Sequence, residues 1–367
     1  MTSRTIPPLL EPYLAIEPSQ SQSQILLTGI LGANTNWLLL RYLYTLLKSK
    51  SQQQAPRPQQ PQGQRRLGLR MPVAAEPDLE PSAQNGGGRN DEEGESVGVL
   101  LVSFLRDFAF WKESAGRLGL DLEGLGRRGK LGFVDGLCVG SGSDGEGAAP
   151  AGGAGRFGGG LPVRRPPVPA AAGAAPGRGP PSPAPTSPVT RGPVSQGQGQ
   201  GPAAEEKWKR SLPSLAVADV SKTLHAVLDE LCQQNKKVVL VIDHLDFLLA
   251  ATSDGNGSVS LALKELLLDL REKSHATILT LSADDPLIAS QTTTLEKDHA
   301  SFVLSLAHAS EMIVSLRLLD TGIAKDVSGV VRITRGGDSG GERQIEEREY
   351  LYHVGGDGGV RVFERGQ

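Results

Sequence analysis

The segment Gly29-Ile-Leu-Gly-Ala-Asn-Thr-Asn36 stands between an apolar run and an apolar helical pattern. Nucleotide-binding α/β proteins place their phosphate loop at such a junction. That loop follows the pattern G-x-x-x-x-G-K-[ST], in which backbone N–H groups surround the phosphates, the lysine supplies a positive charge, and the hydroxyl residue ligates magnesium. The chemistry to be tested here is therefore triphosphate binding.

Neither register of this segment supplies the lysine. Counted from Gly29, the positions of the second glycine, the lysine and the hydroxyl residue hold Asn34, Thr35 and Asn36. If Gly32 is the second glycine, the last two positions hold alanine and asparagine. Gly29, Gly32 and Thr35 could still hold a nucleotide through backbone contacts at a helix N-terminus. The alternative, which the missing lysine favours, is that the two glycines only form a tight turn, and we expect no cofactor.

A second nucleotide-type signal is Val238-Val-Leu-Val-Ile-Asp243, an apolar strand that ends in aspartate. In an NTPase such an aspartate orients magnesium. Without a lysine and a hydroxyl ligand there is little for Asp243 to complete, so we predict no metal site. The six histidines are scattered, and Cys138 and Cys232 form no CxxC or Cys/His cluster. No catalytic residue is predicted, and we expect the chain not to be an enzyme.

The elements that would position these residues alternate in type along the chain. Continuous apolar runs separated by helical patterns predict a mostly parallel central sheet with helices on both faces. The tail alternates apolar and polar residues instead, which predicts antiparallel strands at the edge of the sheet. The expected strands are 25–30, 97–103, 131–135, 238–243, 276–281, 312–318, 330–334, 349–354 and 360–364, and the expected helices 36–48, 107–117, 217–234, 258–273 and 294–309.

Composition divides the chain. It contains 46 glycines and 25 prolines among 367 residues, concentrated in two segments, at about 49–96 and 139–204. Such segments bury too little apolar surface to offset the entropy of ordering. We predict one domain spanning 1–367 with these two disordered inserts.

Charge and hydropathy exclude two classes. The net charge of -3 excludes nucleic-acid binding by the bulk field of the chain. The most apolar segment, Trp37 to Leu47, contains Arg41 and is about half the ~20 residues that cross a bilayer. With no secretory pattern at the N-terminus, we expect a cytoplasmic protein with no membrane contact.

Two groups of side chains are candidates for contact with partners. Arg127, Arg128 and Lys130 precede a predicted strand and could contact RNA phosphates, or they could be a solvated turn. Arg332 and Arg335 on the predicted C-terminal strands could also contact RNA, or the alternation of these strands could simply turn them toward water. Aromatic residues and an arginine gather at 103–112, where they could form a subunit interface or pack in the core. The proposed interface residues are Phe104, Arg106, Phe108 and Trp111.

Together, Ser103–Lys112, Leu131–Leu137, Val239–Leu248 and the lysine-free turn resemble the sixth subunit of the fungal Elongator complex. The resemblance implies a RecA-like fold without phosphate-loop residues and no catalytic activity. It further implies a hetero-hexameric ring with two sister RecA-like subunits, attached to the remaining Elongator subunits. That ring would bind tRNA and support wobble-uridine modification, in the cytoplasm and also the nucleus. The two inserts depart from the compact family pattern.

Two other classes of protein stay open. One is an NTPase with an unconventional phosphate loop. The other is an inactive recombinase-like protein that binds DNA.

Overall fold

The apolar runs form strands that are buried on both sides, as their composition requires. The computed structural model describes residues 6–16, 22–30, 32–48, 96–137, 207–252, 257–319, 324–338 and 344–364. All of these belong to one compact unit. The predicted inserts lie outside the described residues, apart from Ser96.

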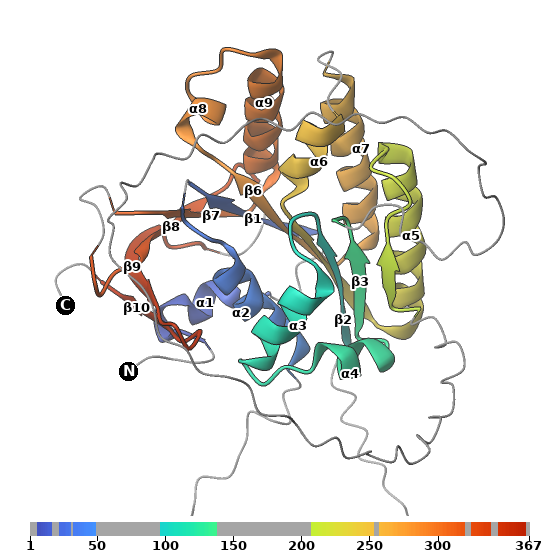
Figure 1. Cartoon of the computed structure of the whole chain (residues 1–367), viewed down its shortest axis with the longest axis horizontal. Helices are drawn as coiled ribbons and strands as arrows, with labels where there is room; N and C mark the ends of the chain where they lie inside the picture. Colours follow the sequence, from blue (N-terminus) through green and yellow to red (C-terminus); the bar gives the residue numbers. More distant parts are fainter. Residues whose placement is uncertain are drawn as a thin grey trace, which may run out of the picture. The chain divides into compact units, whose positions relative to one another are not determined.

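Within the described residues the strands form a ten-stranded sheet in the order β10-β9-β8-β7-β1-β6-β5-β2-β3-β4 (Figure 1). The strands from β7 to β4 in this order pair in parallel, and β8, β9 and β10 extend the sheet antiparallel. The bounds are β1 (Ser23–Gly29), β2 (Val97–Ser103), β3 (Leu131–Asp135), β4 (Lys209–Ser211), β5 (Lys237–Asp243), β6 (Ala276–Ser282), β7 (Met312–Arg317), β8 (Gly329–Arg335), β9 (Arg348–Val354) and β10 (Val360–Phe363).

Helices cover both faces of the parallel part of the sheet. A short 3₁₀ helix and α1 to α4 pack on one face, and α5, α6, α7 and α9 pack on the other. The bounds are Pro8–Leu10 for the 3₁₀ helix, α1 (Glu11–Leu14), α2 (Asn36–Leu47), α3 (Phe108–Gly116), α4 (Leu122–Arg127), α5 (Val217–Gln234), α6 (Leu245–Thr252), α7 (Ser258–Lys273), α8 (Asp285–Ile288) and α9 (Thr294–Ala309). None of the helices in the described residues is both long and apolar enough to span a bilayer.

The prediction of fold class is confirmed. The parallel strands follow the order β3-β2-β5-β6-β1-β7, with antiparallel strands continuing beyond β7, which is a RecA-like arrangement. The elements that sequence patterns missed are short, namely β4, α1, α4, α6 and α8, because each spans too few residues to show a period.

Arg41 ties the helix after the candidate loop to the far end of the sheet. Its side chain is 2% exposed on α2. One guanidinium nitrogen, Nη1, donates to the carbonyl of Trp37 at 3.0 Å, and Nη2 donates to the carbonyl of Gly358 at 2.7 Å, in the turn between β9 and β10. Burial lowers the pKa of Arg41 to about 10. The guanidinium therefore joins two segments more than 300 residues apart in sequence.

We expect Arg41→Ala to lower the free energy of unfolding by about 2–4 kcal/mol, because it removes two charge-assisted hydrogen bonds and opens a cavity. Urea titration followed by circular dichroism measures the change. Arg117→Ala, which removes an exposed arginine paired with Glu113 on α3, is the matched control and should change stability by less than about 1 kcal/mol. Equal effects of the two variants would contradict the structural role of Arg41.

Candidate functional site

The candidate phosphate loop connects β1 to α2 through residues 30–35. Both glycines are needed for its backbone path. A Cβ on Gly29 would lie 2.9 Å from the carbonyl oxygen of Ala33, and Gly32 has φ +81°, a conformation that other residues rarely adopt. The structure thus gives the two glycines a role in the turn itself.

The first amide of α2 is already occupied by a side chain of the loop. The backbone N–H of Asn36 donates to Oδ1 of Asn34 at 2.7 Å. The carbonyl of Thr35 accepts the first helical bonds, from the amides of Leu38 and Leu39 at 3.0 Å each. A bound phosphate would use the free amides at a helix N-terminus. The Oδ1 atom of Asn34 therefore occupies the position from which a bound phosphate would accept a hydrogen bond from this amide.

The positions that would hold the lysine and the magnesium ligand are closed to solvent. Thr35 is 2% exposed and Asn36 is 4% exposed. Among the described residues, Oγ1 of Thr35 and Oδ1 of Asn36 have no hydrogen-bond partner. Neither side chain carries a positive charge. These residues do not fit a triphosphate with its magnesium ion.

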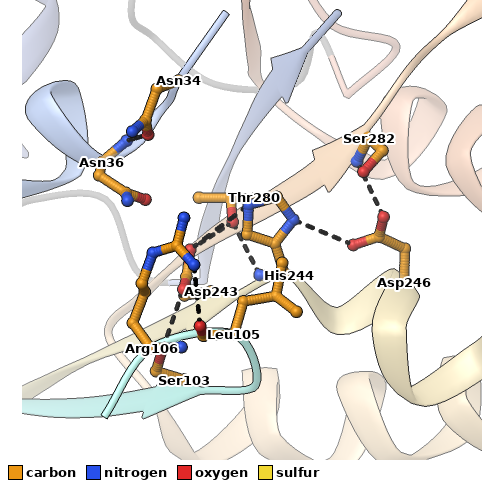
Figure 2. Close-up of polar contacts among 10 residues, drawn as sticks. All are labelled: Asn34, Asn36, Ser103, Leu105, Arg106, Asp243, His244, Asp246, Thr280 and Ser282. Atoms are coloured by element: carbon orange, nitrogen blue, oxygen red, sulfur yellow. Dashed lines mark hydrogen bonds and ion pairs between the residues drawn. The ribbon is translucent and has the colours of Figure 1, made fainter. Parts of the chain in front are cut away.

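Asp243 lies at the carboxyl end of β5, between β2 and β6, and its side chain is fully buried. Figure 2 shows its carboxylate held from both sides. Oδ2 accepts from the hydroxyl of Ser103 at 3.0 Å, and Oδ1 accepts from the hydroxyl of Thr280 at 3.0 Å. Burial raises the pKa of Asp243. The oxygens that would orient magnesium in an NTPase here link three neighbouring strands.

His244 follows Asp243 in a left-handed conformation, with φ +56°. Its backbone N–H donates to the Thr280 hydroxyl at 2.8 Å. Its ring Nδ1 lies 3.6 Å from Oδ1 of Asp246, whose other oxygen accepts from the amide of Ser282 at 3.1 Å. Burial lowers the pKa of His244, but the contact with Asp246 and the charge of Asp243 outweigh it, so the net shift is upward. For Asp246, burial raises the pKa, and the contacts with His244 and Ser282 outweigh it, giving a net lowering.

Arg106 brings a positive charge to this site from outside the loop. Figure 2 shows its guanidinium on the side of Asp243 that faces Asn36. Nη1 donates to the carbonyl of Leu105 at 3.0 Å, and the guanidinium lies 5.3 Å from the centre of the Phe110 ring. The charge of Arg106 lowers the pKa values of both Asp243 and His244 as a minor contribution. Sequence patterns predicted Arg106 as an interface residue and missed its place beside Asp243.

Three of the four residues predicted for a subunit interface lie inside this chain. Phe104 and Trp111 are fully buried, and Phe108 is 5% exposed. They pack in the cores of this chain: Phe108, for example, stacks at 5.1 Å from both Phe133 and Trp208. The Asp107 side chain caps α3 by accepting from the amide of Phe110. That cap fixes which aromatic side chains turn inward.

The residues predicted to contact RNA lie near the amino end of β3, whereas Asp243 lies at the carboxyl ends of the strands. Arg127 and Arg128 are exposed at the end of α4, and Lys130 immediately precedes β3. They do not join Asp243, which lies at the carboxyl ends of the strands. Their contact with RNA stays a prediction.

A groove of about 430 Å³ also opens at the amino ends of the strands, beside the starts of β5 and β6. Its lysines flank the C-terminal ends of α5 and α7, where positive charges offset the helix dipole. Its lining residues are Cys232, Asn235, Lys236, Lys237, Val238, Lys273, Ser274 and His275. Within the described ranges no group of three or more His, Cys, Asp or Glu side chains is arranged to hold a metal ion.

Comparison with known proteins adds little to this geometry. No protein-family model matches the sequence, and no curated protein sequence matches it. Among solved structures, the chain is similar to a KaiC-like protein from the hyperthermophilic archaeon Pyrococcus horikoshii. The identity is 14% over 98% of this chain and 97% of that chain, with a TM-score of 0.47. The RecA-like assignment depends on the strand order, not on this similarity.

Asn34→Ala should expose the Asn36 amide and lower the free energy of unfolding by about 0.5–1.5 kcal/mol, the usual net contribution of one hydrogen bond. Asn34→Asp keeps the acceptor and adds a negative charge at the helix N-terminus, so its stability should match the wild type or exceed it. Both are measured by urea unfolding. An unchanged stability in Asn34→Ala would contradict the capping role.

The pair His244–Asp246 makes stability depend on pH. Because the folded pKa of His244 is raised, its contribution is complete below its unfolded pKa of about 6.5 and is lost as the pH rises through the folded value. Because the folded pKa of Asp246 is lowered, its contribution is lost in acid, below an unfolded pKa of about 3.9. His244→Asn tolerates the left-handed backbone and does not titrate.

We therefore expect the stability advantage of the wild type over His244→Asn to be largest between about pH 4 and 6.5 and to shrink toward pH 8. Thermal unfolding at a series of pH values measures it. Asp246→Asn should flatten the same dependence. A difference that grows above neutral pH would show that the sign is wrong.

Proposed function

We propose that this chain is a non-catalytic structural subunit of the Elongator complex. It would join two sister RecA-like subunits in a hetero-hexameric ring that binds tRNA and supports modification of wobble uridines. The remaining Elongator subunits would be its further partners, in the cytoplasm and the nucleus. The proposal assigns it no cofactor and no metal.

The observation that carries the proposal is a nucleotide-type site with no positive charge in its loop, where the first amide of α2 and the Asp243 carboxylate already have partners inside the chain. Asn34 accepts from the first amide of α2, and the Asp243 carboxylate accepts from two hydroxyls. A RecA-like subunit without a nucleotide can still contribute its surfaces to a ring. The quoted segments that resemble the Elongator subunit supply the particular assembly.

The two alternative classes predict different ligands. An NTPase with an unconventional loop needs positive charge at the triphosphate. Arg106 is the nearest candidate, but it faces the buried Asp243 rather than an open loop. An inactive recombinase-like protein would prefer single-stranded DNA to RNA.

Co-expression with the two sister subunits should give a complex whose native mass corresponds to two copies of each chain. Titration of the isolated chain with Mg-ATP in a calorimeter should release no binding heat. A chain that remains monomeric beside its expected partners would contradict the scaffold role. ATP binding with turnover by the isolated chain would support the NTPase class, and a preference for single-stranded DNA over tRNA would support the recombinase-like class.

A further inference from the structure

The antiparallel extension of the sheet has one face that the described helices leave uncovered. On one side, Val331, Tyr350 and Val360 belong to the core under α1 and α2. The second core, under α5, α6, α7 and α9, contains no residue of β8, β9 or β10. In Figure 1 these strands extend away from α5 and α7. We call the uncovered side the open face. It carries Arg317 of β7, Val330 and Arg332 of β8, Glu349, Leu351 and His353 of β9, and Arg361 and Phe363 of β10; Val330 is fully buried among its neighbours on this face.

Register places these side chains next to one another. Arg332 pairs with Glu349 across β8 and β9, and Arg361 pairs with His353 across β9 and β10. Arg317 contributes from β7, with its guanidinium 3.7 Å from the Glu349 carboxylate. Three arginines from three strands thus share the face with one glutamate. Arg332 and Arg361 are exposed.

The open face also carries an apolar row. Leu351 and Phe363 are opposite each other in the β9–β10 register and are both partly exposed. The Arg361 guanidinium lies 5.7 Å from the centre of the Phe363 ring. A sheet surface with a partly exposed aromatic ring offers unpaired bases a stacking platform, while neighbouring arginines contact phosphates.

We propose that the open face of β8–β10 binds a single-stranded segment of RNA. Phosphates would lie against Arg332 and Arg361, and a base would stack on Phe363. The inference rests in part on the proposed function, since the assembly proposed there acts on RNA.

The combination of exposed arginines with a partly exposed aromatic ring favours RNA over an acidic protein segment. An acidic peptide would use the arginines but would leave the partly exposed Phe363 ring without a stacking partner. An RNA strand uses both, because bases and phosphates alternate along it. Duplex nucleic acid would fit less well, since its bases are not free to stack on a sheet.

The test is fluorescence anisotropy of the full chain with a labelled single-stranded oligoribonucleotide of mixed sequence, at about 50 and about 200 mM salt. Arg332→Ala combined with Arg361→Ala should weaken binding at least about tenfold at the lower salt. It should also reduce the slope of log affinity against log salt by about 1.4, or about 0.7 for each lost phosphate contact. Phe363→Ala should weaken binding on the order of tenfold without changing that slope.

The control is Lys222→Ala combined with Lys297→Ala, which removes the same charge from exposed positions on α5 and α9. It should weaken binding less than about threefold. Arg332→Lys with Arg361→Lys should retain the salt slope, and thermal unfolding should show that every variant folds. No binding by the wild type, equal losses in the two double variants, or stronger binding of a poly-glutamate peptide than of RNA would each overturn the proposal.

Native mass measurement of the same variants with the sister subunits separates this inference from the proposed function. If the complex assembles and its RNA affinity does not change in the Arg332/Arg361 variant, the RNA surface is wrong and the scaffold role survives. If no complex forms but RNA binding by the chain depends on Arg332 and Arg361, the scaffold role is wrong and the RNA surface survives.

Discussion

The buried carboxylate of Asp243 is the constraint around which the carboxyl edge of the sheet is built. It is fully buried, and its two oxygens accept from hydroxyls on β2 and β6. Leaving such a carboxylate without partners would cost several kcal/mol, on the order of the penalty for a broken buried pair. Both hydrogen bonds form only when β2, β5 and β6 are in their observed register. His244 is fixed by the same group, since its amide donates to the Thr280 hydroxyl that bonds Asp243.

Asp243 stands where an aspartate would orient magnesium in an NTPase, and its carboxylate joins strands from distant parts of the sequence. On the other side of the site, Asn34 closes the start of α2, and Arg41 on the same helix reaches the β9–β10 turn. In a nucleotide-binding protein, phosphate would bind at the start of α2. Here α2 links the carboxyl end of the parallel strands to the antiparallel extension of the sheet.

Sequence patterns predicted the fold because six apolar runs and five periodic helices span enough residues to show their type. Side-chain environment was harder to predict. From the sequence, the aromatic residues at 104–111 could point toward the core or toward solvent. The choice depends on the residue at which α3 begins, which the structure places directly after its cap Asp107. The missing lysine was visible in the sequence, but the acceptor role of Asn34 and the contact between His244 and Asp246 depend on backbone geometry. Alternation predicted that Arg332 and Arg335 both face water, and both are exposed, although they project from opposite faces of β8.

The self-capped loop has an evolutionary consequence. A single change of Thr35 to lysine would place an ammonium group at a position that is 2% exposed, while Asn34 would still hold the amide that phosphate needs. A phosphate could reach the Asn36 amide only after the side chain of Asn34 had released it, so a lysine at position 35 would not be sufficient. A stepwise gain of phosphate binding would therefore pass through a loop that has lost its own hydrogen bond before it gains one from a ligand.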